Sequence, residues 1–268
     1  MYKKIIFFIL IILSIFFLDK TVVVIGCDWE TVFYPIITHP LENPYQYLAF
    51  NPFWAFIGLL PLSLFSLKLS YVINFVGNLA AYIYSLRKLK ISWLFIVAFC
   101  LLPITLANSI NGNIEGYVSL GFILPPQIGL FFLLSKVQIG LPVAIFFAVK
   151  IYRGNGIKQL FFTFLPVMIG FVISFLIYGN WMAKSNVLFD ISWNRSIFPY
   201  GLPIGIIALL LSLYTGKIGF AIFSACFFSP YFTGHTWSFV IYGAFSVISD
   251  YLTQYRKEIE KLGSGFTL

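Results

Sequence analysis

Charged residues are scarce in this sequence. They make up only 10% of its 268 residues, whereas hydrophobic residues make up 60% and the mean hydropathy is +0.94. A typical soluble domain is about 25% charged and about half apolar, so this composition excludes an ordinary soluble protein. The chain has room for about eight to ten bilayer crossings of roughly 20 residues each. It therefore predicts an all-α, polytopic transmembrane helical bundle.

Cysteine and acidic residues are also few. Cys27, Cys100 and Cys226 lie far apart and lack the spacing of metal ligands, which argues against a zinc motif and a disulfide framework. No Gly-rich phosphate loop or nucleophile elbow occurs, so we expect no cofactor, although the sequence leaves a divalent metal ion open. The 17 basic residues outnumber the 9 acidic ones, but they form small clusters between apolar runs. This distribution indicates membrane orientation and no nucleic-acid partner.

The basic clusters predict which loops face the cytoplasm. They lie at residues 87–90, 150–158 and 256–261, and the positive-inside rule places such loops in the cytoplasm. Lys3 and Lys4 precede the first apolar run, which lacks a signal-peptide cleavage site. We therefore expect a retained first helix with the amino terminus in the cytoplasm.

The acidic segments then fall on the opposite side. Residues 26–52, 111–116 and 180–200 are expected to form outer loops of a single transmembrane domain spanning residues 1–249. An amphipathic cytoplasmic tail is expected at 250–268, because its charges alternate along a helical pattern that ends at a glycine. The carboxy terminus is then cytoplasmic, in a protein of the cell membrane.

Two apolar stretches must cross the bilayer an odd number of times to preserve this alternation. They are residues 52–86 and residues 117–149, the second of which is interrupted by Pro125-Pro126 and Lys136. We predict broken or partly re-entrant helices at both places, which requires a backbone buried in protein or lining a cavity. The alternative is that the positive-inside rule fails at one loop. Further spans are expected at 91–108, 159–178, 202–214, 218–232 and 237–249.

The first outer loop combines carboxylates, aromatic residues and prolines. Asp28 and Glu30 follow the end of the first helix. A carboxylate at such a rim can accept a proton from a hydroxyl nucleophile, and neighbouring aromatics raise its pKa by desolvation. The same composition is typical of an interfacial aromatic belt with acidic residues in water, so composition alone does not establish a site.

A second candidate segment runs through Asn113 and Glu115 to Lys136 and Gln138. Glu115 begins a predicted helix, where the helix dipole is a sufficient explanation. Lys136 interrupts an apolar stretch, and an ionisable residue there is by default a functional hypothesis. It could bind a phosphate or pair with an outer carboxylate, or its ammonium group could reach the interface along its aliphatic stem.

Two further residues complete the candidates. His235 could bind a sugar hydroxyl or a phosphate, although a lone histidine is commonly a structural hydrogen-bonding residue. Arg195 lies in the third outer loop with Lys184 and Asp190.

The order of these segments resembles that of the GT-C membrane glycosyltransferases, in particular glycosyltransferase family 87, mannosyltransferase-like enzymes that use polyprenyl-phosphate sugars. That family has a catalytic Asp after a first helix, followed by short proline motifs, a Gly-Gln-x-Asn segment and a Lys-Pro-Gln-like element. The matching segments, over roughly residues 1–150, are Asp28, Asn43-Pro44-Tyr45, Asn51-Pro52-Phe53, Leu60-Pro61-Leu62, Gly112-Asn113-Ile114-Glu115 and Lys136-Val137-Gln138.

The resemblance implies a GT-C-like bundle that transfers a sugar from a polyprenyl-phosphate donor to a hydroxyl acceptor on the outer face. Membrane lipids and that donor would be its partners. Asp28 would be the general base, with Glu30 as support or as an alternative base. Lys136, with His235 or Arg195, would face the phosphate and neutralise the leaving group.

The matched motifs also imply substrate-binding roles for Tyr45, Asn113, Glu115 and Gln138. Two other classes of function stay open. The broken helices could surround the substrate of a small-solute or lipid transporter, and a non-catalytic membrane protein of the same fold is the third possibility.

Overall fold

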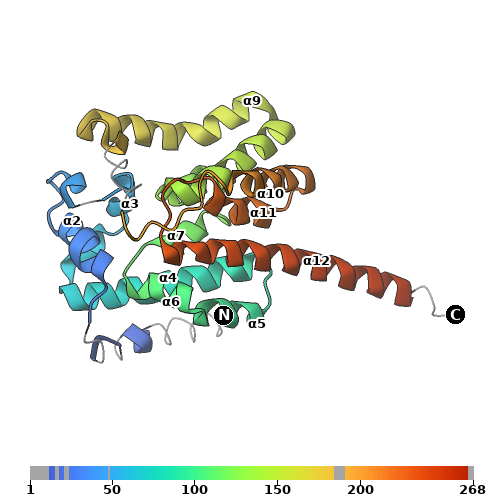
Figure 1. Ribbon diagram of the computed structural model, residues 1–268, viewed down its shortest axis with the longest axis horizontal. Coiled ribbons are helices and arrows are strands. Elements are labelled where there is room, and N and C mark those ends of the chain that lie inside the picture. The colour runs from blue at the N-terminus through green and yellow to red at the C-terminus, as the bar shows by residue number, and fades with distance from the viewer. Residues whose placement is uncertain (1–11, 16–17, 21–23, 48, 184–190, 265–268) are drawn as a thin grey trace.

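The computed structural model describes residues 12–15, 18–20, 24–47, 49–183 and 191–264. In this part of the chain every named element is a helix (Figure 1), and the only strand-like feature is an isolated bridge between Asn194 and Thr233. The all-α prediction is therefore confirmed. Most of the predicted first helix lies outside the described residues.

By length and composition, the described residues contain two helices that could cross a membrane. They are α4 (Leu67–Lys88) and α9 (Val137–Tyr178), and a bent pair, α5 (Trp93–Leu101) with α6 (Pro103–Ile110), would make a third. Only 22% of the most apolar window in α9 is buried inside the protein. An apolar helix with so little burial is expected to face lipid.

The long helix α9 is broken at Gly156. This residue has φ +76° and ψ 180°, a backbone conformation that glycine alone adopts readily. Figure 1 shows the chain turning back at this point, so that α9 consists of two arms. The break falls inside the predicted cytoplasmic loop at 150–158, which is helical on both sides of the turn and not an open loop.

The span expected at 91–108 is not straight. It bends by 61° between α5 and α6, where Leu102 is extended with φ −59° and ψ 133°. Pro103 causes the bend, because proline disfavours the α conformation in the residue before it and lacks an amide hydrogen for the preceding turn.

The two stretches predicted to be broken each contain short helices ahead of a long one. Between residues 52 and 88 the chain forms α3 (Trp54–Ile57), η3 (Leu60–Leu64) and α4. After residue 114 it forms α7 (Glu115–Leu120) and α8 (Pro126–Leu134) before α9 begins. At 1.5 Å per residue, helices of four to nine residues are too short to cross a bilayer alone. The remaining short elements are η1 (Trp29–Phe33), α2 (Tyr34–Thr38) and η2 (Pro44–Tyr47).

The carboxy-terminal half is built from apolar helices that pack on one another. These are α10 (Leu202–Thr215), α11 (Ile218–Ser224), η5 (Ala225–Phe227), η6 (Gly234–Trp237) and α12 (Ser238–Ser264). A boundary was expected between a span at 237–249 and a tail from residue 250, but α12 runs through it without interruption. No proline or glycine stands near Asp250 to end the helix.

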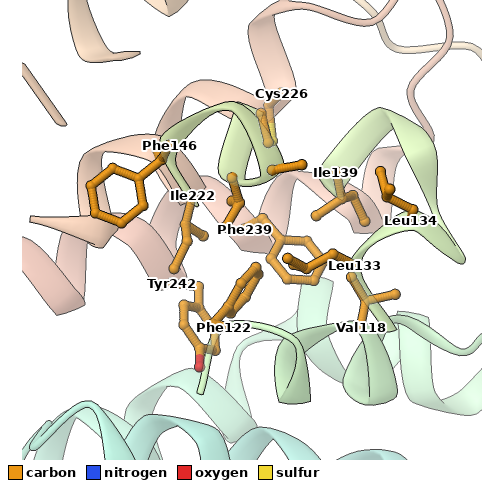
Figure 2. Close-up of a cluster of buried hydrophobic side chains, with 14 of the residues drawn as sticks. Val118, Phe122, Leu133, Leu134, Ile139, Phe146, Ile222, Cys226, Phe239 and Tyr242 are labelled. Carbon is orange, nitrogen blue, oxygen red and sulfur yellow. The ribbon is translucent and has the colours of Figure 1, made fainter. Parts of the chain in front are cut away.

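The main hydrophobic core lies where these helices meet. Side chains from α4, α5, α7, α8, α9, α11 and α12 contribute to it, among them those drawn in Figure 2. Phe122 packs edge-on against Phe239 and Tyr242, with ring centroids 5.9 and 5.3 Å apart. This core fixes α7 relative to the start of α9 and to η6, which carry most of the candidate site.

Candidate functional site

Residues from four separate parts of the chain meet in one buried polar network. The contributing parts are the turn at Asp28, the segment 111–116, Lys136 and the segment 233–237. Three of the candidate segments predicted from the sequence therefore lie together.

Asp28 and Asn113 form the outer end of the network. The Asn113 side-chain amide donates a hydrogen bond of 2.7 Å to Asp28 Oδ2, and its own oxygen accepts one of 2.8 Å from the Ile114 amide. Asn111 Oδ1 accepts a longer bond from the Asp28 amide, at 3.4 Å. Asp28 is half-buried, so its carboxylate is held in place while remaining accessible.

Glu115 and Lys136 form the inner end. Lys136 Nζ lies 2.5 Å from Glu115 Oε1, with the two side chains only 7% and 0% exposed. The snorkelling alternative for Lys136 is therefore wrong, since its ammonium group points into the protein. Thr236 also donates its hydroxyl to Glu115 Oε1. The other oxygen, Oε2, is buried and forms no hydrogen bond with any described residue.

His235 lies between these two ends. Its Nε2 is 3.0 Å from Thr233 Oγ1, 3.4 Å from Asn113 Nδ2 and 3.8 Å from Glu115 Oε1. Thr233 Oγ1 is in turn 2.6 Å from Thr236 Oγ1. Burial lowers the pKa of His235 from its ordinary 6.5, and the charge of Glu115 opposes this effect. Burial thus favours the neutral form of the ring.

Helix α4 holds the segment 111–116 in place. Asn74 Nδ2 donates to the Gly112 carbonyl at 3.0 Å, and Asn78 Oδ1 accepts from the Gly116 amide at 2.8 Å. Sequence reasoning missed both residues, as well as Thr233 and Thr236. A signal was present for the asparagines, because two amides four residues apart in an apolar helix share one face.

Gly112 packs directly against Trp29. It has φ +80°, and a Cβ at this position would lie 2.4 Å from Trp29 Cβ. The Gly112→Ala substitution is expected to lower the free energy of unfolding by about 2–4 kcal/mol, since it adds both a left-handed penalty and overpacking. Thermal unfolding in detergent measures the change.

Gly216→Ala is the matched control for this prediction. Gly216 has φ +70° but has open space where its Cβ would lie, so only the backbone penalty applies. Equal destabilisation by the two substitutions would show that the contact with Trp29 contributes nothing.

An apolar groove of about 230 Å³ lies beside the network. Gln138, Trp181 and Tyr231 are among its lining residues. The pKa of Tyr231 is raised, mainly by burial, and the charges of Asp28 and Glu115 add to the shift. The groove is therefore close enough to the network to feel its charges.

The other candidates lie elsewhere. Glu30 is exposed, and Tyr45 is buried in an aromatic cluster, stacked on Trp181 at 5.0 Å. Arg195 is exposed and its guanidinium group donates to the Ser192 carbonyl at 3.0 Å. Within the described ranges, no hydrogen bond joins these three side chains to the network. Lys184 and Asp190 lie outside the described residues.

The network offers acid–base and charge-stabilising chemistry. It contains an accessible carboxylate, a neutral imidazole and a buried ion pair. Over the part of the chain that the structure describes, no group of three or more His, Cys, Asp or Glu side chains is placed to hold a metal ion.

Comparisons with known proteins assign no function, so the function is argued from the network. No protein-family model, no curated protein and no solved structure matches the chain.

Proposed function

We propose that this protein is an integral membrane glycosyltransferase. It transfers a sugar from a polyprenyl-phosphate donor to a hydroxyl acceptor on the outer face of the cell membrane, and Asp28 is its general base. The observation that carries the proposal is the half-buried Asp28 carboxylate, held through one oxygen by Asn113 Nδ2 at 2.7 Å. A base must be oriented toward its substrate and yet remain accessible to it, and a carboxylate that is fixed by one hydrogen bond and only half-buried supports this role.

The groove lined by Gln138 and Tyr231 supports the same function. Its lining combines apolar side chains with the amide of Gln138 and the phenol of Tyr231. A lipid-linked sugar has an apolar chain and a polar head, so its binding site needs both kinds of surface. The GT-C-like arrangement of motifs, with Asp28 ahead of the Asn113 and Lys136 segments, gives further support.

The proposal includes a polytopic topology with both termini in the cytoplasm. It is supported by the apolar side chains that α9 and α10 expose, such as Val172, Leu176, Ile207 and Leu210. Exposed aliphatic faces of this kind are stable only against lipid or another protein. In this topology the network faces outward and the basic residues at 87–90 and around Gly156 face the cytoplasm.

The test is sugar transfer by the purified protein in lipid vesicles. Vesicles containing a radiolabelled polyprenyl-phosphate mannose or glucose and a lipid-soluble alcohol acceptor are compared for the wild type, Asp28→Asn and Glu30→Gln. The proposal expects transfer by the wild type and by Glu30→Gln but not by Asp28→Asn. Transfer by Asp28→Asn at the wild-type rate would overturn the role of Asp28.

A transporter is the second candidate function. The observation that favours it is the buried pair of Glu115 and Lys136, because ionisable residues inside a membrane domain commonly mark a substrate or proton pathway. Solute flux into vesicles that depends on Lys136 but not on Asp28 would favour transport over sugar transfer.

A further inference from the structure

We propose that His235 is a second proton acceptor of the site, acting through Nδ1, and that a relay of Thr233, Thr236 and Glu115 fixes its proton on Nε2. Only the source of the accepted proton rests on the proposed function. The state of the ring itself follows from the hydrogen-bond network.

The direction of every hydrogen bond in the relay follows from Glu115. An ionised carboxylate can only accept hydrogen bonds, and Lys136 Nζ at 2.5 Å from Glu115 Oε1 keeps it ionised. The Thr236 hydroxyl must therefore donate to Glu115. A hydroxyl has a single proton, so Thr236 accepts from Thr233 across their 2.6 Å contact.

The same reasoning fixes the histidine tautomer. Since Thr233 gives its only proton to Thr236, it must accept one from His235 Nε2, 3.0 Å away. The Asn113 amide lies 3.4 Å from Nε2 but cannot donate to a nitrogen that carries a proton. Of these two neighbours, it therefore donates only to Asp28. This assignment leaves Nδ1 with a lone pair, and no described residue forms a hydrogen bond with it. The side chain is mostly buried but remains 14% exposed.

Charges around His235 oppose one another. Burial and the positive charge of Lys136 disfavour the imidazolium, whereas Glu115 and Asp28 favour it. The charged groups that act on His235 are Asp28, Glu115 and Lys136. The other titratable groups near enough to Glu115 to feel its charge are Tyr82, Cys226 and Tyr231. The carboxylate at the end of the relay thus compensates the charge that Nδ1 acquires, as the acid of a catalytic triad does for its histidine.

This arrangement gives the proposed reaction a place for its proton. The acceptor oxygen gives its proton to Asp28 and uses the released electron pair to form the bond to the sugar. The leaving phosphate takes the electron pair of the broken carbon–oxygen bond. Asp28 Oδ2 and His235 Nε2 both lie beside Asn113 Nδ2, so the two groups share one site, and in the proposal the proton taken up by Asp28 passes on to His235 Nδ1. Its binding at Nδ1 breaks no bond in the relay and restores the Asp28 carboxylate.

Nitrogen-15 NMR of histidine-labelled protein tests the proposal without any substrate. The sequence has only two histidines, and His39 Nδ1 lies 3.0 Å from the Pro35 carbonyl, to which only an Nδ1–H can donate. His39 is therefore an internal reference of the opposite tautomer. In the wild type, His235 is expected to carry its proton on Nε2 and to become doubly protonated at a lower pH than an ordinary histidine.

Three variants separate a relay from ordinary packing. Thr236→Val removes the hydroxyl, so Thr233 and Asn113 can donate to Nε2, and the ratio of Nε2–H to Nδ1–H should fall about tenfold, the effect of roughly one hydrogen bond. Thr236→Ser should restore the wild-type ratio. Glu115→Gln should lower the pKa of His235 further, since it removes the charge that stabilises the imidazolium.

Two results would overturn the proposal. One is an Nδ1–H tautomer at His235 in the wild type, and the other is an unchanged tautomer ratio in Thr236→Val while His39 keeps its wild-type signals. If Thr236→Val caused a folding defect, the His39 signals would change as well. The tautomer ratio of Thr236→Ser would then test the relay. If Asp28→Asn retained sugar transfer, the proposed function would fail while the NMR result would stand.

Discussion

Sugar transfer by Asp28→Asn is expected to be slower than wild-type transfer by about 10²–10⁴-fold, the usual contribution of a general base. Asparagine keeps the size of the side chain but cannot take the proton of the acceptor hydroxyl. It can still pair with Asn113 Nδ2 through its own oxygen, since that contact of 2.7 Å requires only an acceptor. The rate should therefore fall while donor binding is preserved. The measurement is the initial rate of transfer at saturating donor in vesicles, together with the donor affinity.

Glu30→Gln is the matched control, because Glu30 is two residues away and exposed. It should retain the wild-type rate within about twofold, as surface substitutions away from a site usually change little. If Glu30→Gln lost activity and Asp28→Asn retained it, the base would be Glu30. Loss in Asp28→Asn with an unchanged melting temperature would separate the loss of the base from unfolding.

The sequence predicts the class of the fold better than its detail. Composition is enough to predict apolar helices, and the cluster at 150–158 and Pro125-Pro126 mark two of the places where they break, whereas the break at Pro103 is not predicted and α12 has no break at residue 250. The count of eight to ten crossings rests on the length of the chain, at roughly 20 residues for each crossing. The structure gives two or three such helices among the described residues, because Pro103 bends one run and short helices such as α7 and α8 occupy others. The helix propensity of a segment does not show which neighbouring segments cover the apolar side chains of a short helix.

The residues of the candidate site are also predictable only in part, because their contacts depend on the tertiary structure. Chemical type singles out Asp28, Glu115, Lys136 and His235, since each is polar in an apolar context. Their partners depend on tertiary contacts, and Glu115 meets Thr236 across 121 positions of the chain. Thr236 carries no distinguishing pattern of its own. Arg195 satisfies the same chemical criterion and yet faces solvent, so residue type alone selects too many candidates.

Lys136→Met is expected to lower the free energy of unfolding by about 3–5 kcal/mol, the cost of leaving one member of a buried ion pair without its partner. Methionine fills the space of the lysine stem, so the loss comes from the charge and not from a cavity. Glu115 is 0% exposed and its Oε2 already has no described partner, so water cannot replace the ammonium group without opening the core. Denaturation in detergent, followed by the near-ultraviolet circular dichroism of the many aromatic residues, measures the change.

The double variant Glu115→Gln, Lys136→Met separates the pair from its surroundings. Removing both charges leaves no uncompensated ion, so the double variant should be less destabilised than the sum of the two single variants. Lys20→Met is the control, since Lys20 lies 4.0 Å from Asp19 with 69% of its side chain exposed, and exposed ion pairs contribute little to stability. Strict additivity of the two buried substitutions would contradict a direct interaction between Glu115 and Lys136. It would also remove the reason for Glu115 to stay ionised, on which the orientation of the whole relay to His235 depends.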